Sequence, residues 1–187
     1  YRYDWYWQKD KGANFLFGNK QPLKTIETIS VFYKNQPTYN PQKIDNPKGA
    51  MKRHLAKNPN KITKNVKDVM GESWKETDMD EAQNYFGKNY EPDKLLPTQV
   101  LYFAKDQRGK VHPTQKPVPL LEYLIKTYTN NGGTVLDNCA GSGSTAIACM
   151  NTERNYLLME KDDGYFKVIQ DRIEVHKKIL FPDVDFT

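Results

Sequence analysis

The chain has 187 residues, with 28 lysines and arginines against 23 acidic residues, and a formal net charge of +5 at pH 7. Hydrophobic residues make up 37% and aromatic residues 12% of the chain, which is enough for a packed core and excludes disorder throughout. Two cysteines exclude a disulfide scaffold and a four-cysteine zinc site, and no stretch approaches the roughly 20 apolar residues of a membrane span, so we expect a cytoplasmic protein without a metal site.

The first part of the chain, residues 1–34, predicts two strands. Tyr3, Trp5 and Trp7 alternate with more polar positions, which is the period of a strand. Two tryptophans so near the terminus indicate a strand that lies inside a sheet. A loop follows, and the β-branched and aromatic residues of 28–33 predict the second strand.

The second part, residues 35–110, is rich in Asn, Lys and Pro. Asp45 is the only acid between positions 34 and 67, so nine basic residues minus one acid give this stretch a charge of +8. Such a stretch is either a solvated polar insertion or a nucleic-acid-binding patch whose cations replace counterions on phosphates. The candidate DNA-binding residues are Lys52, Arg53, Lys57, Lys61 and Lys64. Residues 97–104 predict a strand that returns to the core.

The third part, residues 111–187, has the clearest periodicity. Its pattern predicts a helix, a strand, a short helix, a strand and a final helix, at 117–129, 134–137, 144–150, 156–160 and 164–180. This β-α-β-α order favours a parallel sheet of Rossmann type, and hence an α/β protein. The apolar stripe of the final helix is predicted at Phe166, Ile169, Ile173, His176 and Leu180, and both cysteines, Cys139 and Cys149, are expected in the core.

A glycine turn lies between the strand at 134–137 and the helix at 144–150. Gly141 and Gly143 would allow a ligand to approach the backbone closely. Glu160 follows 17 residues after Gly143, at the end of the next strand, where a carboxylate can accept hydrogen bonds from two ribose hydroxyls. The alternative for Glu160 is a carboxylate that caps the following helix.

The carboxylate of Asp137, next to the glycine turn, helps to distinguish which nucleoside cofactor the turn would bind. The glycine spacing also fits a dinucleotide, so NAD is one candidate. Asp137 would repel a pyrophosphate, but it suits a ligand with an ammonium group and no phosphate, such as S-adenosylmethionine. The alternative for Asp137 is an acid that only caps the loop.

Two motifs together carry a resemblance to a known family. The segment HPTQKP at 112–117 precedes an apolar helix, and DNCAGSGST follows at 137–145. This combination resembles the DNA methyltransferases that modify the N6 of adenine or the N4 of cytosine, in their permuted motif order. The resemblance implies a Rossmann-like methyltransferase sheet, S-adenosylmethionine as cofactor and double-stranded DNA as partner. It places the cofactor at Thr114, Lys116, Asp137, Gly141, Ser142, Gly143 and Glu160.

The same resemblance implies a division of the chain. Residues 1–34 would belong to the catalytic core, 35–110 would form an inserted target-recognition region, and 111–187 would hold the cofactor. The family's catalytic signature, Asp, Asn or Ser followed by two prolines and an aromatic residue, is absent, so no catalytic residue is assigned. Because Tyr1 stands where Met would begin a protein, we expect an N-terminally incomplete domain that does not methylate DNA by itself. The alternatives are a non-catalytic DNA- or cofactor-binding remnant and, more remotely, an NAD-dependent enzyme.

Overall fold

The computed structural model describes residues 1–45, 94–105 and 110–184, which fall into two compact units. One unit consists of residues 1–42 and 98–187, and the other of residues 43–97. In the second unit the described residues form a short antiparallel pair, β3 (Ile44–Asp45) and β4 (Lys94–Leu95). The five candidate DNA-binding residues lie outside the described residues, so their role stays a prediction.

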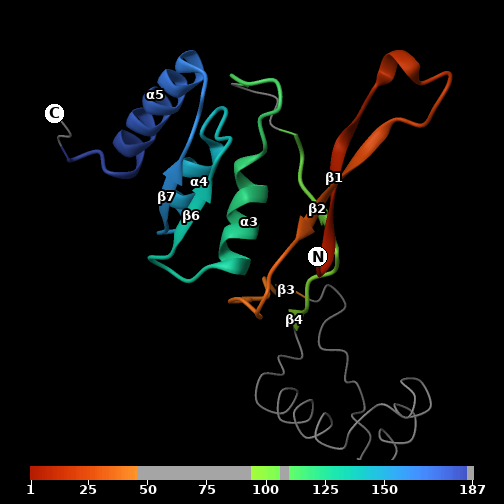
Figure 1. Cartoon of the computed structure of the whole chain (residues 1–187), viewed down its shortest axis with the longest axis horizontal. Helices are drawn as coiled ribbons and strands as arrows, with labels where there is room; N and C mark the ends of the chain where they lie inside the picture. Colours follow the sequence, from red (N-terminus) through yellow and green to blue (C-terminus); the bar gives the residue numbers. More distant parts are fainter. Residues whose placement is uncertain (46–93, 106–109, 185–187) are drawn as a thin grey trace, which may run out of the picture. The chain divides into compact units, whose positions relative to one another are not determined.

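A three-stranded sheet contains the two strands predicted near the N-terminus (Figure 1). β1 (Tyr3–Ala13) pairs antiparallel with β2 (Lys24–Val31) and parallel with β5 (Val100–Tyr102). β1 extends into the predicted loop as far as Ala13, and the hairpin turns at a short 3₁₀ helix, η1 (Phe15–Phe17). The central position of β1 confirms that the tryptophan-rich strand lies inside a sheet.

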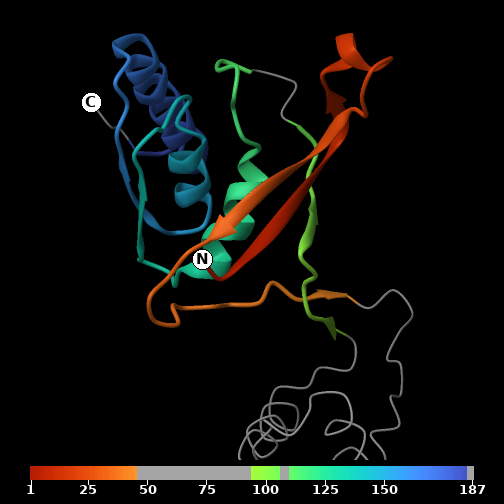
Figure 2. The same cartoon turned by 45° about the vertical axis from the view of Figure 1, so that its right-hand side comes forward.

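The core of this sheet is formed against helix α3 (Val118–Tyr128), which lies between the β1–β2 hairpin and the β6–β7 pair described below (Figures 1 and 2). Trp5 and Trp7 are 3% and 2% exposed, and both indole nitrogens have partners. Trp5 Nε1 donates to the Tyr128 hydroxyl at 2.6 Å, and Trp7 Nε1 donates to the Phe103 carbonyl at 2.8 Å. The indole rings therefore bury a large apolar area without leaving a polar atom unpaired.

The C-terminal part of the chain has the predicted β-α-β-α order. β6 (Thr134–Asp137) and β7 (Asn155–Leu158) are parallel and are joined through α4 (Ser144–Asn151), and α5 (Asp163–Leu180) follows. Most of α4 is buried, with Ala148 and Cys149 packed in a cluster with Ile125 of α3. The predicted parallel pair and its helices are confirmed. Among the described residues no helix is long and apolar enough to cross a bilayer.

Three features differ from the sequence-based expectations. Within the described part of the chain the strands form three separate sheets, so β6 pairs only with β7 there. Cys139 is exposed, because it lies in the turn after β6 rather than on a packed face; Cys149 is buried as predicted. On α5 only Ile169 is fully buried, since Phe166 and Leu180 are 46% and 38% exposed.

Candidate functional site

The glycine turn is held in a conformation that favours glycine at two positions. Gly141 has a φ of 55° and Gly143 a φ of 73°, both in the left-handed region. A β-carbon at Gly143 would lie 3.1 Å from Cγ1 and Cγ2 of Ile169 on α5. The turn therefore needs glycine at position 143 for two reasons, backbone conformation and close packing.

Asp137, the last residue of β6, stabilises the turn that follows it. Its Oδ1 accepts a hydrogen bond from the Cys139 amide at 3.1 Å, and its Oδ2 accepts one from the Thr145 hydroxyl at 2.6 Å. These bonds match the loop-capping alternative for this residue. A carboxylate has about four acceptor positions, so each oxygen keeps one for a ligand.

Glu160 joins the glycine turn to the segment after β7. Its Oε2 accepts from the Gly141 amide at 2.7 Å, and its Oε1 accepts from the amides of Lys161 and Asp162 at 2.9 and 3.0 Å. The backbone amides of Asp162 and Gly141 lower the pKa of Glu160 below its ordinary value, so the side chain is a carboxylate at neutral pH. Asp162, and not Glu160, caps α5, by accepting from the Tyr165 amide.

Behind the turn, α5 supplies a residue that the sequence analysis did not identify. The Arg172 guanidinium donates to the Ser142 carbonyl and lies 3.4 Å from the Ser144 hydroxyl. Ser142 and Ser144 are 3% and 5% exposed. Ser142, a predicted cofactor residue, therefore has its side chain buried. Arg172 lies one helical turn after Ile169, a spacing that could have pointed to it.

His112, the first residue of the HPTQKP segment, lies against the glycine turn. A β-carbon placed at Gly141 would be 3.5 Å from three atoms of the His112 ring, and that ring packs edge-to-face on Tyr165 at a centroid distance of 4.3 Å. The amide and hydroxyl of Thr114 lie 3.2 and 3.1 Å from His112 Nδ1. His112 and Tyr165 were missed as site residues, because a single ring in a loop or a helix carries no pattern.

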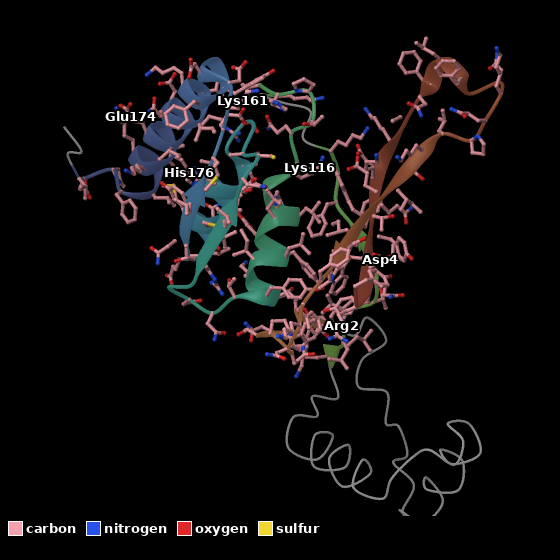
Figure 3. All side chains as sticks on the ribbon, in the orientation of Figure 1. Arg2, Asp4, Lys116, Lys161, Glu174 and His176 are labelled. Carbon is pink, nitrogen blue, oxygen red and sulfur yellow. The ribbon has the colours of Figure 1, made fainter. Side chains whose placement is uncertain are left out.

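Lys116 turns toward the β1–β2 hairpin (Figure 3). Its ammonium donates to the Thr114 carbonyl at 3.2 Å and lies 3.6 Å from Glu27 Oε2, while 45% of the side chain stays exposed. Glu27 also accepts from Lys9 at 2.9 Å. The predicted residues Thr114 and Lys116 are thus brought together, and Lys9 and Glu27 join them. No cluster of metal-binding side chains occurs within residues 1–45, 94–105 and 110–184.

Comparison with known proteins agrees with this geometry. The family model for DNA methylases that modify N6 or N4 matches residues 1–171. The putative methylase YubD of Escherichia coli K12 is 37% identical over 89 residues, 48% of this chain and 38% of that protein. The type II methyltransferase M.HpaI of Haemophilus parainfluenzae is 27% identical over 181 residues, 89% of this chain and 54% of that protein.

Two solved structures show the same fold. The M1.HpyAVI–SAM complex superposes with a TM-score of 0.55 at 22% identity, over 92% of this chain and 61% of that chain. The cytosine-N4-specific PvuII DNA methyltransferase superposes with the same score at 16% identity, over 95% of this chain and 56% of that chain. The chain thus spans about half the length of several relatives. Its sequence, its fold and its paired motifs show that it belongs to the N6/N4 DNA methylase family.

Proposed function

We propose that the protein of this chain transfers a methyl group from S-adenosylmethionine to an exocyclic amino group of adenine or cytosine in DNA. The contact between Gly141 and Glu160 carries the proposal, since it brings a carboxylate with one remaining acceptor position to the backbone of the glycine turn. Family membership supports the same cofactor and disfavours both an NAD-dependent enzyme and a non-catalytic remnant.

The site residues suit the three polar parts of this cofactor. Glu160 would accept one hydrogen bond from a ribose hydroxyl, at the acceptor position left on its Oε2, and Asp137 would face the ammonium group. Lys116 and Thr114 would lie toward the carboxylate. The absence of any phosphate in S-adenosylmethionine fits a turn that has two carboxylates beside it, because these would repel a pyrophosphate.

The proposed methyl transfer needs no nucleophilic side chain. The bound cofactor supplies an activated methyl group on a sulfonium, and an amino nitrogen can attack it directly. What the protein contributes is alignment of the two reactants in a site that excludes water. The turn, fixed by Asp137, Glu160 and Arg172, is suited to that task, and the target base would have to leave the DNA helix to reach it.

Calorimetric titration tests the cofactor assignment. We expect S-adenosylmethionine to bind more tightly than NAD, and Glu160→Ala to weaken S-adenosylmethionine binding by about 10- to 100-fold, as expected for the loss of a charged acceptor. Lys161→Gln serves as the control, because it changes an exposed neighbour whose amide, not its side chain, meets Glu160. Tighter binding of NAD would refute the assignment.

The DNA part of the proposal depends on the basic stretch at residues 34–67. Replacing Lys57, Lys61 and Lys64 together by Gln should reduce the slope of log affinity against log salt by about 2 to 3 units, if all three lie on phosphates. A filter-binding or fluorescence titration at several salt concentrations measures this slope. An unchanged slope would favour the solvated insertion instead.

The missing signature leads to a separate expectation. The printed sequence holds no Asp, Asn or Ser followed by two prolines and an aromatic residue, the group that would hold the flipped base. We therefore propose that a polypeptide of these 187 residues alone transfers no labelled methyl group to mixed DNA. Robust incorporation that Asp137→Ala abolishes would show that the acceptor site lies within these residues.

A further inference from the structure

Three charged side chains form a line at one end of the β1–β2–β5 sheet. Lys9 Nζ lies 2.9 Å from Glu27 Oε1, and Glu27 Oε2 lies 3.6 Å from Lys116 Nζ. The exposed fraction of the side chain rises along the line, from 2% for Lys9 to 35% for Glu27 and 45% for Lys116. We call these residues the charge line; it begins in the core and ends at the HPTQKP segment.

The buried end of the line is an unusual place for a lysine. Lys9 follows Trp5 and Trp7 on the buried face of β1, and its ammonium lies 5.7 Å from the centre of the Trp7 ring. A lysine is almost never this buried unless it is paired. Its position directly follows the parallel pairing of β1 with β5, which ends at Gln8 opposite Tyr102. In open α/β sheets this is the edge where ligands bind.

The charges along the line do not cancel. Two ammonium groups minus one carboxylate leave a charge of +1. Burial would raise the pKa of Glu27, but the hydrogen bond from Lys9 and the charge of Lys116 outweigh this and lower it, so Glu27 is ionised at neutral pH. Because Lys9 already balances Glu27, the surplus positive charge falls at Lys116, the exposed end.

We infer that Lys9 and Glu27 set the strength with which Lys116 binds the carboxylate of the cofactor's amino-acid part. Lys9 is a positioning residue that touches no ligand: its buried charge neutralises Glu27 and leaves Lys116 available. Without Lys9, Glu27 would hold Lys116 in a neutral pair. This inference rests on the proposed function, because it takes Lys116 to face the carboxylate of S-adenosylmethionine.

The test compares two ligands that differ only by that carboxylate, S-adenosylhomocysteine and S-adenosyl-3-thiopropylamine, in titrations of the full chain. Lys9→Met should weaken S-adenosylhomocysteine binding by about three- to tenfold, the effect of one charge acting across several ångströms of partly screened protein. Binding of the ligand without the carboxylate should not change. The double variant Lys9→Met/Glu27→Gln restores the charge of +1 and should restore the affinity.

A second variant keeps the inference open to refutation if Lys9→Met fails to fold. Glu27→Gln alone removes the negative charge, so affinity for S-adenosylhomocysteine should not fall, whereas a role of Glu27 in merely orienting Lys116 predicts a fall. The matched control is Glu174→Gln, which breaks the exposed pair with Lys178 on α5, far from Lys116 in Figure 3. This control should leave both affinities as they are.

The outcomes separate this inference from the proposed function. If Lys9→Met leaves S-adenosylhomocysteine binding unchanged, or weakens both ligands equally, the charge line has only a structural role and the inference is wrong. The same holds if the double variant does not recover. If the unmodified chain binds neither ligand, the cofactor assignment itself fails, and this inference fails with it.

Discussion

The glycine-turn region and the β1–β2 hairpin region hold their residues in place in different ways. In the turn region, the bonds join residues of the C-terminal part of the chain: Glu160 and Gly141 are 19 positions apart, and Arg172 and Ser142 are 30 apart. In the hairpin region, Trp5 meets Tyr128 across 123 positions. The turn is thus held from within the C-terminal part of the chain, whereas the two tryptophans of the hairpin are held by residues 123 and 96 positions away, Tyr128 and Phe103.

The two regions also contribute differently to the proposed cofactor site. The turn region presents the groups suited to a nucleoside, while the ion pair between Glu27 and Lys116 joins the hairpin region to the site. Changes in the turn should therefore alter ligand binding directly. Changes in the hairpin should act mainly on folding, except along the charge line.

The largest expected effect lies in the hairpin core. Trp7→Ala removes a side chain that is 2% exposed, together with its hydrogen bond to the Phe103 carbonyl, and should lower the free energy of unfolding by about 3 to 5 kcal/mol. Tyr102→Ala on the neighbouring strand removes a ring that is 66% exposed and should cost far less. Urea denaturation measures both changes. Equal losses would contradict the assignment of the core.

Two glycines with the same backbone conformation sharpen the comparison within the C-terminal region. Gly143→Ala should lower the free energy of unfolding by about 2 to 4 kcal/mol, because left-handed strain adds to a clash with Ile169. Gly132 has a φ of 76° but nothing within 4 Å of an added β-carbon, so Gly132→Ala should cost only about 1 to 2 kcal/mol. If the two losses are equal, packing against α5 contributes nothing to the turn.

A smaller effect is expected at the back of the turn. Arg172→Gln removes a charged donor to the Ser142 carbonyl and should cost about 1 to 2 kcal/mol of stability. It should also weaken cofactor binding, because the turn loses its fixed shape. Lys167→Gln on the same helix breaks only an exposed pair with Asp171 and should change neither property. A loss of stability with unchanged binding would mean that the turn holds its shape without Arg172.

The smallest perturbation probes the two thiols without unfolding the protein. Cys139 is exposed in the glycine turn, whereas burial raises the pKa of Cys149 to about 11. A thiol reagent at pH 8 should therefore modify Cys139 quickly and Cys149 only after denaturation. The rate of the Cys139 reaction should fall when S-adenosylhomocysteine is bound. Rapid labelling of both thiols would contradict the packing of α4.

The sequence predicts the turn region better than the hairpin region, for a physical reason. Glycine spacing, the strand–helix alternation and the position of Glu160 are local patterns, and the structure has each of them. The buried lysine in β1 has no such pattern, because nothing near Lys9 in the sequence shows that it will pair with Glu27, which lies opposite Trp7 on β2. Cys139 was expected in the core because its small apolar side chain cannot reveal that the turn leaves it exposed.

The role of the other missed residues depends on contacts that form only in the folded chain. His112 lies between the regular elements, and its packing on Gly141 and Tyr165 makes it part of the site. Arg172 is one of several cations on α5, and its bond to the Ser142 carbonyl makes it part of the site. Sequence periodicity predicts which face of a helix is buried, but it does not predict which side chains and backbone groups of the neighbouring element that face will contact.

A crystal structure of the chain with S-adenosylhomocysteine tests the central claim most directly, namely that one ligand joins the glycine turn to the charge line. The account predicts a ribose hydroxyl within hydrogen-bonding distance of Oε2 of Glu160. It also predicts the ligand's carboxylate at Lys116, with Lys9 still paired to Glu27. A nucleoside bound away from Gly141, or a carboxylate directed away from Lys116, would contradict it.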